Sequence, residues 1–227
     1  MNTKNYLTML ALAAGLALAG TGLTSCSGDD DNPVDNPEPP SVGQATVKEL
    51  LNLTKEDIGW VIGTDGKAYM NVAAATSAGT EPLAMVAYID NYQALAIQIT
   101  ESPQEVSWED ANAYINSLPK FKHTVWELPS KWSWLYMLEG CAIEGDMTTV
   151  TAQKLQPIEG FQAKIAATGM GWQTNWYWTS TEVGKSATIM AIDILQGGEA
   201  PPYALINTAP KSYPYGVRGC LVIKFVP

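Results

Sequence analysis

The feature that most constrains the fold is a tryptophan-rich segment in the C-terminal third of the chain. Three of the eight tryptophans lie within seven residues, from Trp172 to Trp178, after a glycine-led start and before a Thr-Ser-Thr-Glu run. About thirty residues later, residues 213–225 have the apolar character of a buried strand. Because large aromatic side chains bury much of their area in a core, we expect these segments to be neighbouring strands of one domain, flanked by exposed loops.

Composition favours one folded domain with appendages. Of the 227 residues, 46% are hydrophobic and 16% are charged, which is typical of a globular protein with a large buried fraction. The formal net charge is −10, and Lys and Arg form no cluster in the sequence. This balance argues against nucleic acid and anionic lipid surfaces as partners, since both need basic residues at the contact. The acidity itself favours solubility.

The first 25 residues have the pattern of a targeting segment. Lys4 precedes an apolar run at residues 6–23, which is too short and too rich in glycine for a spanning helix. The Leu-Thr-Ser-Cys motif that ends at Cys26 resembles the lipobox of bacterial lipoproteins. That resemblance implies cleavage of a signal peptide, residues 1–25, and attachment of a diacylglycerol to the Cys26 thiol. Several acyl chains, palmitate among them, would anchor the chain firmly in a membrane.

Residues 26–45 follow as an acidic, proline-rich stretch with almost no apolar side chains. Such a composition cannot form a core, so we expect an extended tether. The acidic cluster just after Cys26 resembles the surface-export signal of Bacteroidota lipoproteins. The resemblance implies a lipid-anchored outer-membrane protein exposed at the cell surface. A plain solvated linker is the alternative interpretation.

Residues 46–227 alternate short apolar runs with turn signals and are predicted as one domain. Asp65-Gly66 and Asp90-Asn91 each separate two apolar runs, which predicts two hairpins. Ser107 and Ser130 are predicted to cap helices that begin at the next residue. A short helix or turn is expected at 46–53, further short helices at 72–78 and 160–168, and further strands at 177–181, 187–195, 203–207 and 217–226. This mixture predicts an α+β fold.

Four short motifs in a fixed order carry a family resemblance. They are Ser-Trp-Glu-Asp-Ala at 107–111, Trp-Glu-Leu-Pro-Ser at 126–130, Tyr-Trp-Thr-Ser-Thr-Glu at 177–182 and Val-Arg-Gly-Cys-Leu at 217–221. Together they resemble the C-type-lectin-like domain of the Lcl C-terminal and Fibrobacter major-paralogue type, which occurs in Bacteroidota surface lipoproteins.

The resemblance covers about residues 58–225. It implies two main helices packed on small twisted antiparallel sheets, with long loops at 141–176 and 196–215 carrying recognition. The Glu-Pro-Asn, Gln-Pro-Asp and Trp-Asn-Asp motifs of calcium-dependent sugar sites do not occur in the sequence. Sugar binding through such a calcium site is therefore not expected. A fold of this kind carries many functions, so it does not identify a ligand.

Aromatic and amide residues near the C-terminus are the candidate ligand contacts. Flat rings beside amide side chains suit stacking on sugar rings or a hot spot for a protein partner. The candidates are Trp172, Gln173, Asn175, Trp176, Tyr203, Tyr213 and Tyr215. The alternative is that Trp172 and Trp176 cover the core. By periodicity, the tryptophans expected inside the core are Trp108, Trp126, Trp132 and Trp178.

The remaining polar candidates point to structural roles. Glu182 and Arg218 are expected to form an ion pair that joins two strands. Cys141 and Cys220 form either a disulfide or two buried thiols, and the sequence leaves both open. His123 is the single histidine and is expected to face solvent, which argues against a zinc site. No metal or cofactor is expected.

These observations predict a tethered, non-enzymatic binding or adhesion module that recognises a glycan or a protein at the cell surface. An enzyme is disfavoured because the sequence lacks recognisable nucleophile and metal motifs. Two alternatives remain. One is a structural or assembly subunit of a surface fibre, and the other is a display protein with diversified C-terminal loops.

Overall fold

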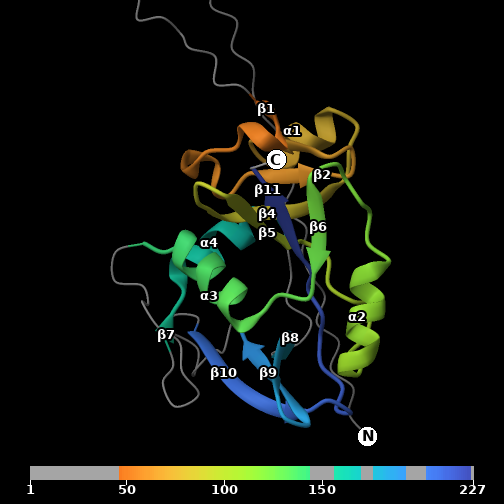
Figure 1. Ribbon diagram of the computed structural model, residues 1–227. Coiled ribbons are helices and arrows are strands. Elements are labelled where there is room, and N and C mark those ends of the chain that lie inside the picture. The colour runs from red at the N-terminus through yellow and green to blue at the C-terminus, as the bar shows by residue number, and fades with distance from the viewer. Residues whose placement is uncertain (1–45, 144–155, 170–175, 193–202, 226–227) are drawn as a thin grey trace, which may run out of the picture. The chain divides into compact units, whose positions relative to one another are not determined.

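A computed structural model describes residues 46–143, 156–169, 176–192 and 203–225 (Figure 1). All of them belong to one compact unit, Gly43–Pro227. The predicted signal peptide and tether, residues 1–45, lie outside the described residues. None of the helices in the described ranges combines the length and apolarity that a membrane span requires.

A seven-stranded antiparallel sheet is the main element of this unit. In spatial order its strands are β1 (Val47–Glu49), β3 (Lys67–Tyr69), β2 (Val61–Gly63), β4 (Pro82–Ile89), β5 (Gln93–Gln98), β11 (Cys220–Lys224) and β6 (Thr124–Glu127). The most C-terminal strand, β11, inserts between β5 and β6, where Leu221 lies opposite Ala96 on one side and Trp126 on the other. Residues Cys220 to Ile223 are consecutively buried, as expected for a central strand covered on both faces.

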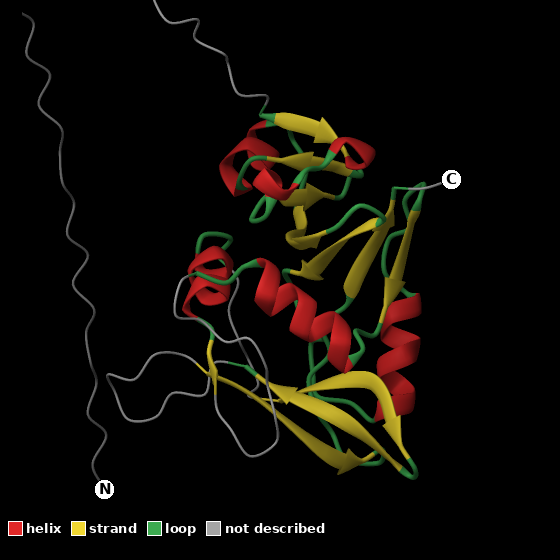
Figure 2. Cartoon of the chain, turned by 60° about the vertical axis from the view of Figure 1, so that its left-hand side comes forward, coloured by secondary structure: helices red, strands yellow, loops and turns green. Residues whose placement is uncertain are grey.

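A four-stranded antiparallel sheet forms the second layer. Its order is β7 (Gln156–Pro157), β10 (Tyr203–Pro210), β9 (Ser186–Ala191) and β8 (Trp176–Val183). Figures 1 and 2 both place this sheet at the end of the folded unit opposite to β1. Strand β1 and the four-stranded sheet are therefore far apart.

Four short helices accompany the sheets in the described ranges. They are α1 (Val72–Ser77), α2 (Trp108–Asn116), α3 (Lys131–Gly140) and α4 (Glu159–Ala166), with 3-10 turns η1 (Leu50–Asn52) and η2 (Lys55–Asp57). Ser107 and Ser130 cap α2 and α3 as predicted, each accepting a backbone N–H three residues later. Gly140 ends α3 against β4, and a Cβ at this position would lie 2.3 Å from the Ala87 carbonyl oxygen.

The predicted fold class, α+β with two main helices on small sheets, is wrong. The described residues are mostly β: eleven strands form two sheets, and the longest helix has ten residues. The structure therefore does not have the arrangement that the family resemblance implied. The error arises because the large sheet depends on β11, whose pairing with β5 joins residues more than a hundred positions apart. Local sequence pattern does not encode such a pairing.

Predictions of single elements were more accurate. Both hairpins are confirmed, as β2–β3 and β4–β5, and so are the helices after residues 107 and 130. The helices expected at 72–78 and 160–168 are confirmed as α1 and α4. For residues 46–53 the prediction is a short helix or turn, and the 3-10 turn η1 confirms it for Leu50–Asn52, whereas Val47–Glu49 form β1.

Strand β8 and residues 213–225 are in contact, but they are not neighbouring strands of one sheet as predicted. β8 belongs to the four-stranded sheet and β11 to the seven-stranded one. Gly216, shortly before β11, forms an isolated bridge with Tyr177 and accepts a hydrogen bond of 3.0 Å from the Trp178 backbone N–H. The contact between the segments therefore lies where the two sheets meet.

The set of buried tryptophans differs from the predicted set. Trp126 and Trp178 are buried as expected and Trp108 is half-buried, but Trp132 is 57% exposed. The fully buried tryptophan of α3 is Trp134, which packs beside Met137 and Leu138. Because α3 is apolar around most of its circumference, periodicity alone could not select its buried stripe.

The predicted ion pair between Glu182 and Arg218 is also wrong. Arg218 is 1% exposed and lies 3.6 Å from the buried carboxylate of Glu101. Its guanidinium also donates to the carbonyl oxygens of Gln98, at 3.1 Å, and Ile99. Glu182 is half-exposed and instead accepts a hydrogen bond from Lys211. Arg218 therefore links the residues just before β11 to the C-terminal end of β5.

Two glutamine substitutions distinguish the observed pairing from the predicted one. Glu101→Gln leaves the Arg218 charge buried without its carboxylate, so the free energy of unfolding should fall by about 3 kcal/mol or more. Glu182→Gln removes a solvent-screened pair and should change it by less than about 1 kcal/mol. Urea denaturation of both variants measures the difference. Equal losses in the two variants would contradict the assignment of Arg218 to Glu101.

Candidate functional site

The predicted ligand residues are only partly described by the structure. Trp172, Gln173 and Asn175 lie outside the described residues, and so does the side chain of Tyr203, whose backbone begins β10. Trp176 and Tyr215 are half-buried and pack against the core, and the Tyr215 ring meets Trp178 edge-on at 5.0 Å. Tyr213 is 54% exposed. Within the described ranges, Tyr213 is therefore the predicted ligand residue with the most accessible ring.

Tyr213 follows Ser212, a lining residue of a cleft of about 470 Å³ at the start of α2. The cleft is lined by Ser107, Glu109, Lys185, Pro210, Lys211 and Ser212, which we call the α2 cleft. These residues come from the start of α2, the turn between β8 and β9, and the end of β10. Tyr213 is fixed next to them because its backbone N–H bonds to the Pro210 carbonyl oxygen at 3.0 Å.

Local sequence explains how each segment reaches the cleft. Ser107 caps α2, and its hydroxyl donates to the Asp110 carboxylate at 2.7 Å. Gly184 adopts a φ of 60° in the tight turn between β8 and β9, a conformation that glycine permits, and this turn presents Lys185. The Trp108 backbone N–H bonds to the Lys211 carbonyl oxygen at 3.0 Å, which ties α2 to the end of β10.

A lysine side chain lies between a tryptophan and a carboxylate at this cleft. The Lys211 ammonium nitrogen lies 4.0 Å from the centre of the Trp108 ring and 2.5 Å from a Glu182 carboxylate oxygen. The Trp108 indole N–H donates to the Thr179 carbonyl oxygen at 2.9 Å, which fixes the ring. From sequence, Trp108 is expected in the core and Glu182 beside Arg218, because nothing local indicates that residues 108, 182 and 211 meet.

The arrangement suits a polar ligand. Ser107 and Ser212 offer hydroxyls, Glu109 a carboxylate and Lys185 an ammonium group, and the exposed Tyr213 follows Ser212 in the chain. Donors and acceptors together with an exposed aromatic side chain are features that position a sugar or a peptide segment. The α2 cleft is therefore our candidate functional site.

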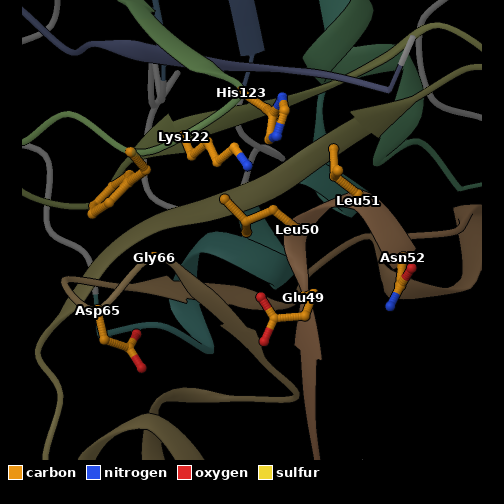
Figure 3. A pocket seen from close by; sticks show the side chains of 9 residues that line it. Glu49, Leu50, Leu51, Asn52, Asp65, Gly66, Lys122 and His123 are labelled. Atoms are coloured by element: carbon orange, nitrogen blue, oxygen red, sulfur yellow. The ribbon is translucent and has the colours of Figure 1, made fainter. Parts of the chain in front are cut away.

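A second pocket, of about 530 Å³, lies between the first residues of the domain and the turn that precedes β6 (Figure 3). It is lined by Glu49, Leu50, Leu51, Asn52, Asp65, Gly66, Phe121, Lys122 and His123. The prediction that His123 faces solvent is confirmed. Its backbone has a φ of 63°, at the third position of the turn that closes from Phe121 to Thr124.

Both carboxylates of this second pocket, those of Asp65 and Glu49, already contact residues of the β2–β3 hairpin. Asp65 accepts the Tyr69 hydroxyl at 2.6 Å and the Lys67 backbone N–H at 3.2 Å. The hydrogen bond to Asp65, together with burial, raises the pKa of Tyr69 to about 12. Glu49 lies 4.0 Å from the Lys67 ammonium group. Because Asp65 has a structural role, we favour the α2 cleft over this pocket.

Cys141 and Cys220 are free and buried, so the disulfide alternative is wrong and the two-thiol alternative holds. The Cys141 thiol donates to the Ala87 carbonyl oxygen at 3.4 Å. Burial raises the pKa of Cys141 to about 12, and burial with the nearby Glu127 carboxylate raises the pKa of Cys220 still further above its ordinary value. Neither thiol therefore provides a thiolate nucleophile at neutral pH.

The two thiols should be unreactive until the domain unfolds. In the chain Gly43–Pro227 at pH 8, a thiol reagent such as DTNB should label neither cysteine, because both hold their protons and lie inside the core. In denaturant without reductant, both should react at once. Rapid labelling of the native protein, or none in denaturant, would contradict two buried free thiols.

In the described parts of the chain, no group of three or more His, Cys, Asp or Glu side chains is placed to hold a metal ion. Comparison with family models, with curated proteins and with solved structures gave no match for this chain.

Proposed function

We propose that this chain is a lipid-anchored, non-enzymatic binding module displayed at the cell surface. The observation that carries the proposal is the position of the α2 cleft. Its lining residues come partly from β10 and the β8–β9 turn, in the sheet at the end of the folded unit opposite to β1 (Figure 1). The α2 cleft therefore lies far from β1, which is the first described strand after Cys26 in the chain.

The sequence before β1 supports a tether between the proposed lipid anchor and the domain. Residues 27–45 are acidic and rich in proline, and an extended chain of this kind spans about 3.1 Å per residue. The tether would therefore hold the domain tens of ångströms from the bilayer. The acidic residues that follow Cys26 are the basis for proposing that the domain is exposed at the surface of the outer membrane.

A glycan is the first candidate ligand and a protein is the second. The α2 cleft offers hydroxyl, carboxylate and ammonium groups, and the exposed Tyr213 follows its lining residue Ser212, which suits sugar recognition. The cleft presents polar and apolar surface in similar amounts, which also suits a peptide loop.

Assembly into a surface fibre is the second candidate function, and the edge strand β6 favours it. In the described residues β6 pairs with β11 alone, and Val125 on β6 is 40% exposed. An open strand edge with an exposed apolar side chain can accept a strand from another subunit. The sequence also leaves open a third function, in which the chain is a display protein with diversified C-terminal loops.

Cys26→Ala tests the anchor. In the cell that makes the protein, the variant should lose metabolically incorporated palmitate and leave the membrane fraction, because the thiol is the proposed lipid attachment point. On intact cells, added protease should cleave the wild-type domain. Palmitate on the variant would contradict lipidation at Cys26, and a protease-resistant wild-type protein would contradict surface exposure.

Tyr213→Ala tests the α2 cleft. A soluble chain Gly43–Pro227, which contains the whole described core, is applied to an array of glycans and mucins with calcium and with chelator. Binding by the variant should fall about tenfold or more, since an exposed aromatic contact at a binding surface is a hot spot. The melting temperature should change little, because the ring is more than half exposed.

Tyr92→Ala is the matched control, because Tyr92 is a tyrosine with 72% exposure between β4 and β5. It should bind like the wild-type chain. Equal binding by the Tyr213 variant and the wild type would contradict the site. Signal that disappears with chelator would show that a metal takes part.

A further inference from the structure

Strand β6, at one end of the seven-stranded sheet, has an open edge. In the described residues this strand pairs with β11 alone. Its burial alternates, because Trp126 faces the core whereas Val125 and Glu127 are exposed. A recess of about 180 Å³ is lined in part by Thr124, Val125 and Trp126, so solvent reaches this strand from the side. We call Thr124–Glu127 the β6 edge.

The hydrogen bonds of β11 show which backbone groups of β6 point outward. In an antiparallel pair, alternate residues of a strand exchange hydrogen bonds with the partner strand. The Lys224 N–H donates to the His123 carbonyl oxygen at 3.1 Å, so the residues two and four positions after His123 also bond to β11. The backbone groups of Thr124 and Trp126 therefore point away from β11, toward the open side. Such groups are a template for a further strand.

The charge along this part of the chain changes sign from one end to the other. The turn before β6 carries Lys120, Lys122 and His123, which are exposed, and the strand ends at the exposed Glu127. In the described ranges, none of the ion pairs involves the two lysines or Glu127. A strand with a cationic start and an anionic end is complementary in charge to an antiparallel copy of itself.

The outward backbone groups and the charges together select one register. A twofold axis beside Val125 places Thr124 of each copy opposite Trp126 of the other. The Trp126 N–H of each copy then donates to the Thr124 carbonyl oxygen of the second copy. The two Val125 side chains lie opposite each other and shield one another from water. Glu127 of each copy faces His123 and the cationic turn of the other.

We propose that two copies of this chain pair through their β6 edges, antiparallel and with the twofold axis at Val125. The pairing joins two seven-stranded sheets into one continuous sheet and occupies the open edge of both copies. Because a twofold contact closes at two subunits, it does not extend into a fibre. The pairing goes beyond the proposed ligand binding and does not depend on it, because the β6 edge and the α2 cleft share no residue.

The contact is small, so the pairing should be weak in solution. Four residues of each strand bury less than the roughly 800 Å² per partner of a standard protein interface. Sedimentation velocity of the chain Gly43–Pro227, from micromolar to millimolar protein, measures it. With increasing concentration the wild-type chain should change from monomer to dimer, and no larger species should form.

Val125→Lys tests the axis. The variant places two ammonium groups opposite each other, so the association constant should fall about tenfold or more, which corresponds to 1.4 kcal/mol. Val183→Lys is the matched control, because Val183 is a 50% exposed valine on β8, in the other sheet. It should associate like the wild-type chain. The urea midpoint of Val125→Lys should stay close to that of the wild type, since Val125 is already 40% exposed.

A pair of charge variants tests the partner and the register. Glu127→Lys places an ammonium group opposite the cationic turn, and His123→Asp places a carboxylate opposite Glu127, so each variant alone should associate more weakly than the wild type. Aspartate suits position 123, where φ is 63°. An equimolar mixture of the two variants should recover association, because the new ammonium group of one faces the new carboxylate of the other.

Three results would overturn the proposal. They are a wild-type chain that stays monomeric up to millimolar concentration, a Val125→Lys variant that associates as strongly as the wild type, and a mixture of the charge variants that recovers nothing. Species larger than a dimer that disappear with Val125→Lys would also overturn the closed pair, and they would favour fibre assembly through the same edge.

Discussion

The rest of the structure depends on the insertion of β11 between β5 and β6. This pairing connects the most C-terminal strand to the β4–β5 hairpin on one side and to the segment between α2 and α3 on the other. Without it, the seven-stranded sheet would divide into a hairpin region and an isolated β6. Such long-range pairing has a high entropic cost before any contact forms, so the buried run from Cys220 to Ile223 must supply the compensating apolar burial.

Arg218 gives this insertion its specificity. The residue precedes β11 by two positions, and its buried guanidinium bonds to the carbonyl oxygens at the end of β5 and lies beside Glu101. A buried ion pair adds little net stability compared with apolar packing, but a misplaced one is costly. A slip of β11 by one residue would remove the charge from these partners. The polar contacts therefore fix the register, while the apolar residues drive the insertion.

The exposed aromatic side chains follow from how the helices attach to the sheets. At the α2 cleft, Lys211 is held between Trp108 and Glu182, three residues from separate parts of the chain. On α3, the burial of Trp134 in the core leaves Trp132 in solvent. In each case the tertiary contact determines which aromatic side chain supports the fold.

The sequence by itself determined the local elements, because their signals are short-range. Asp65-Gly66 specified a hairpin, and Ser107 and Ser130 specified helix starts through hydrogen bonds to residues three positions away. Only the tertiary structure decided the β-rich architecture, the partner of Arg218, the free state of both buried cysteines and the exposed side of α3. These features depend on contacts between distant segments, and the apolar pattern of each segment is compatible with several such contacts. The physical reason is that apolar side chains are buried by contacts between distant segments. The hydrogen bonds of a helix cap or a turn, in contrast, form between residues of one short segment.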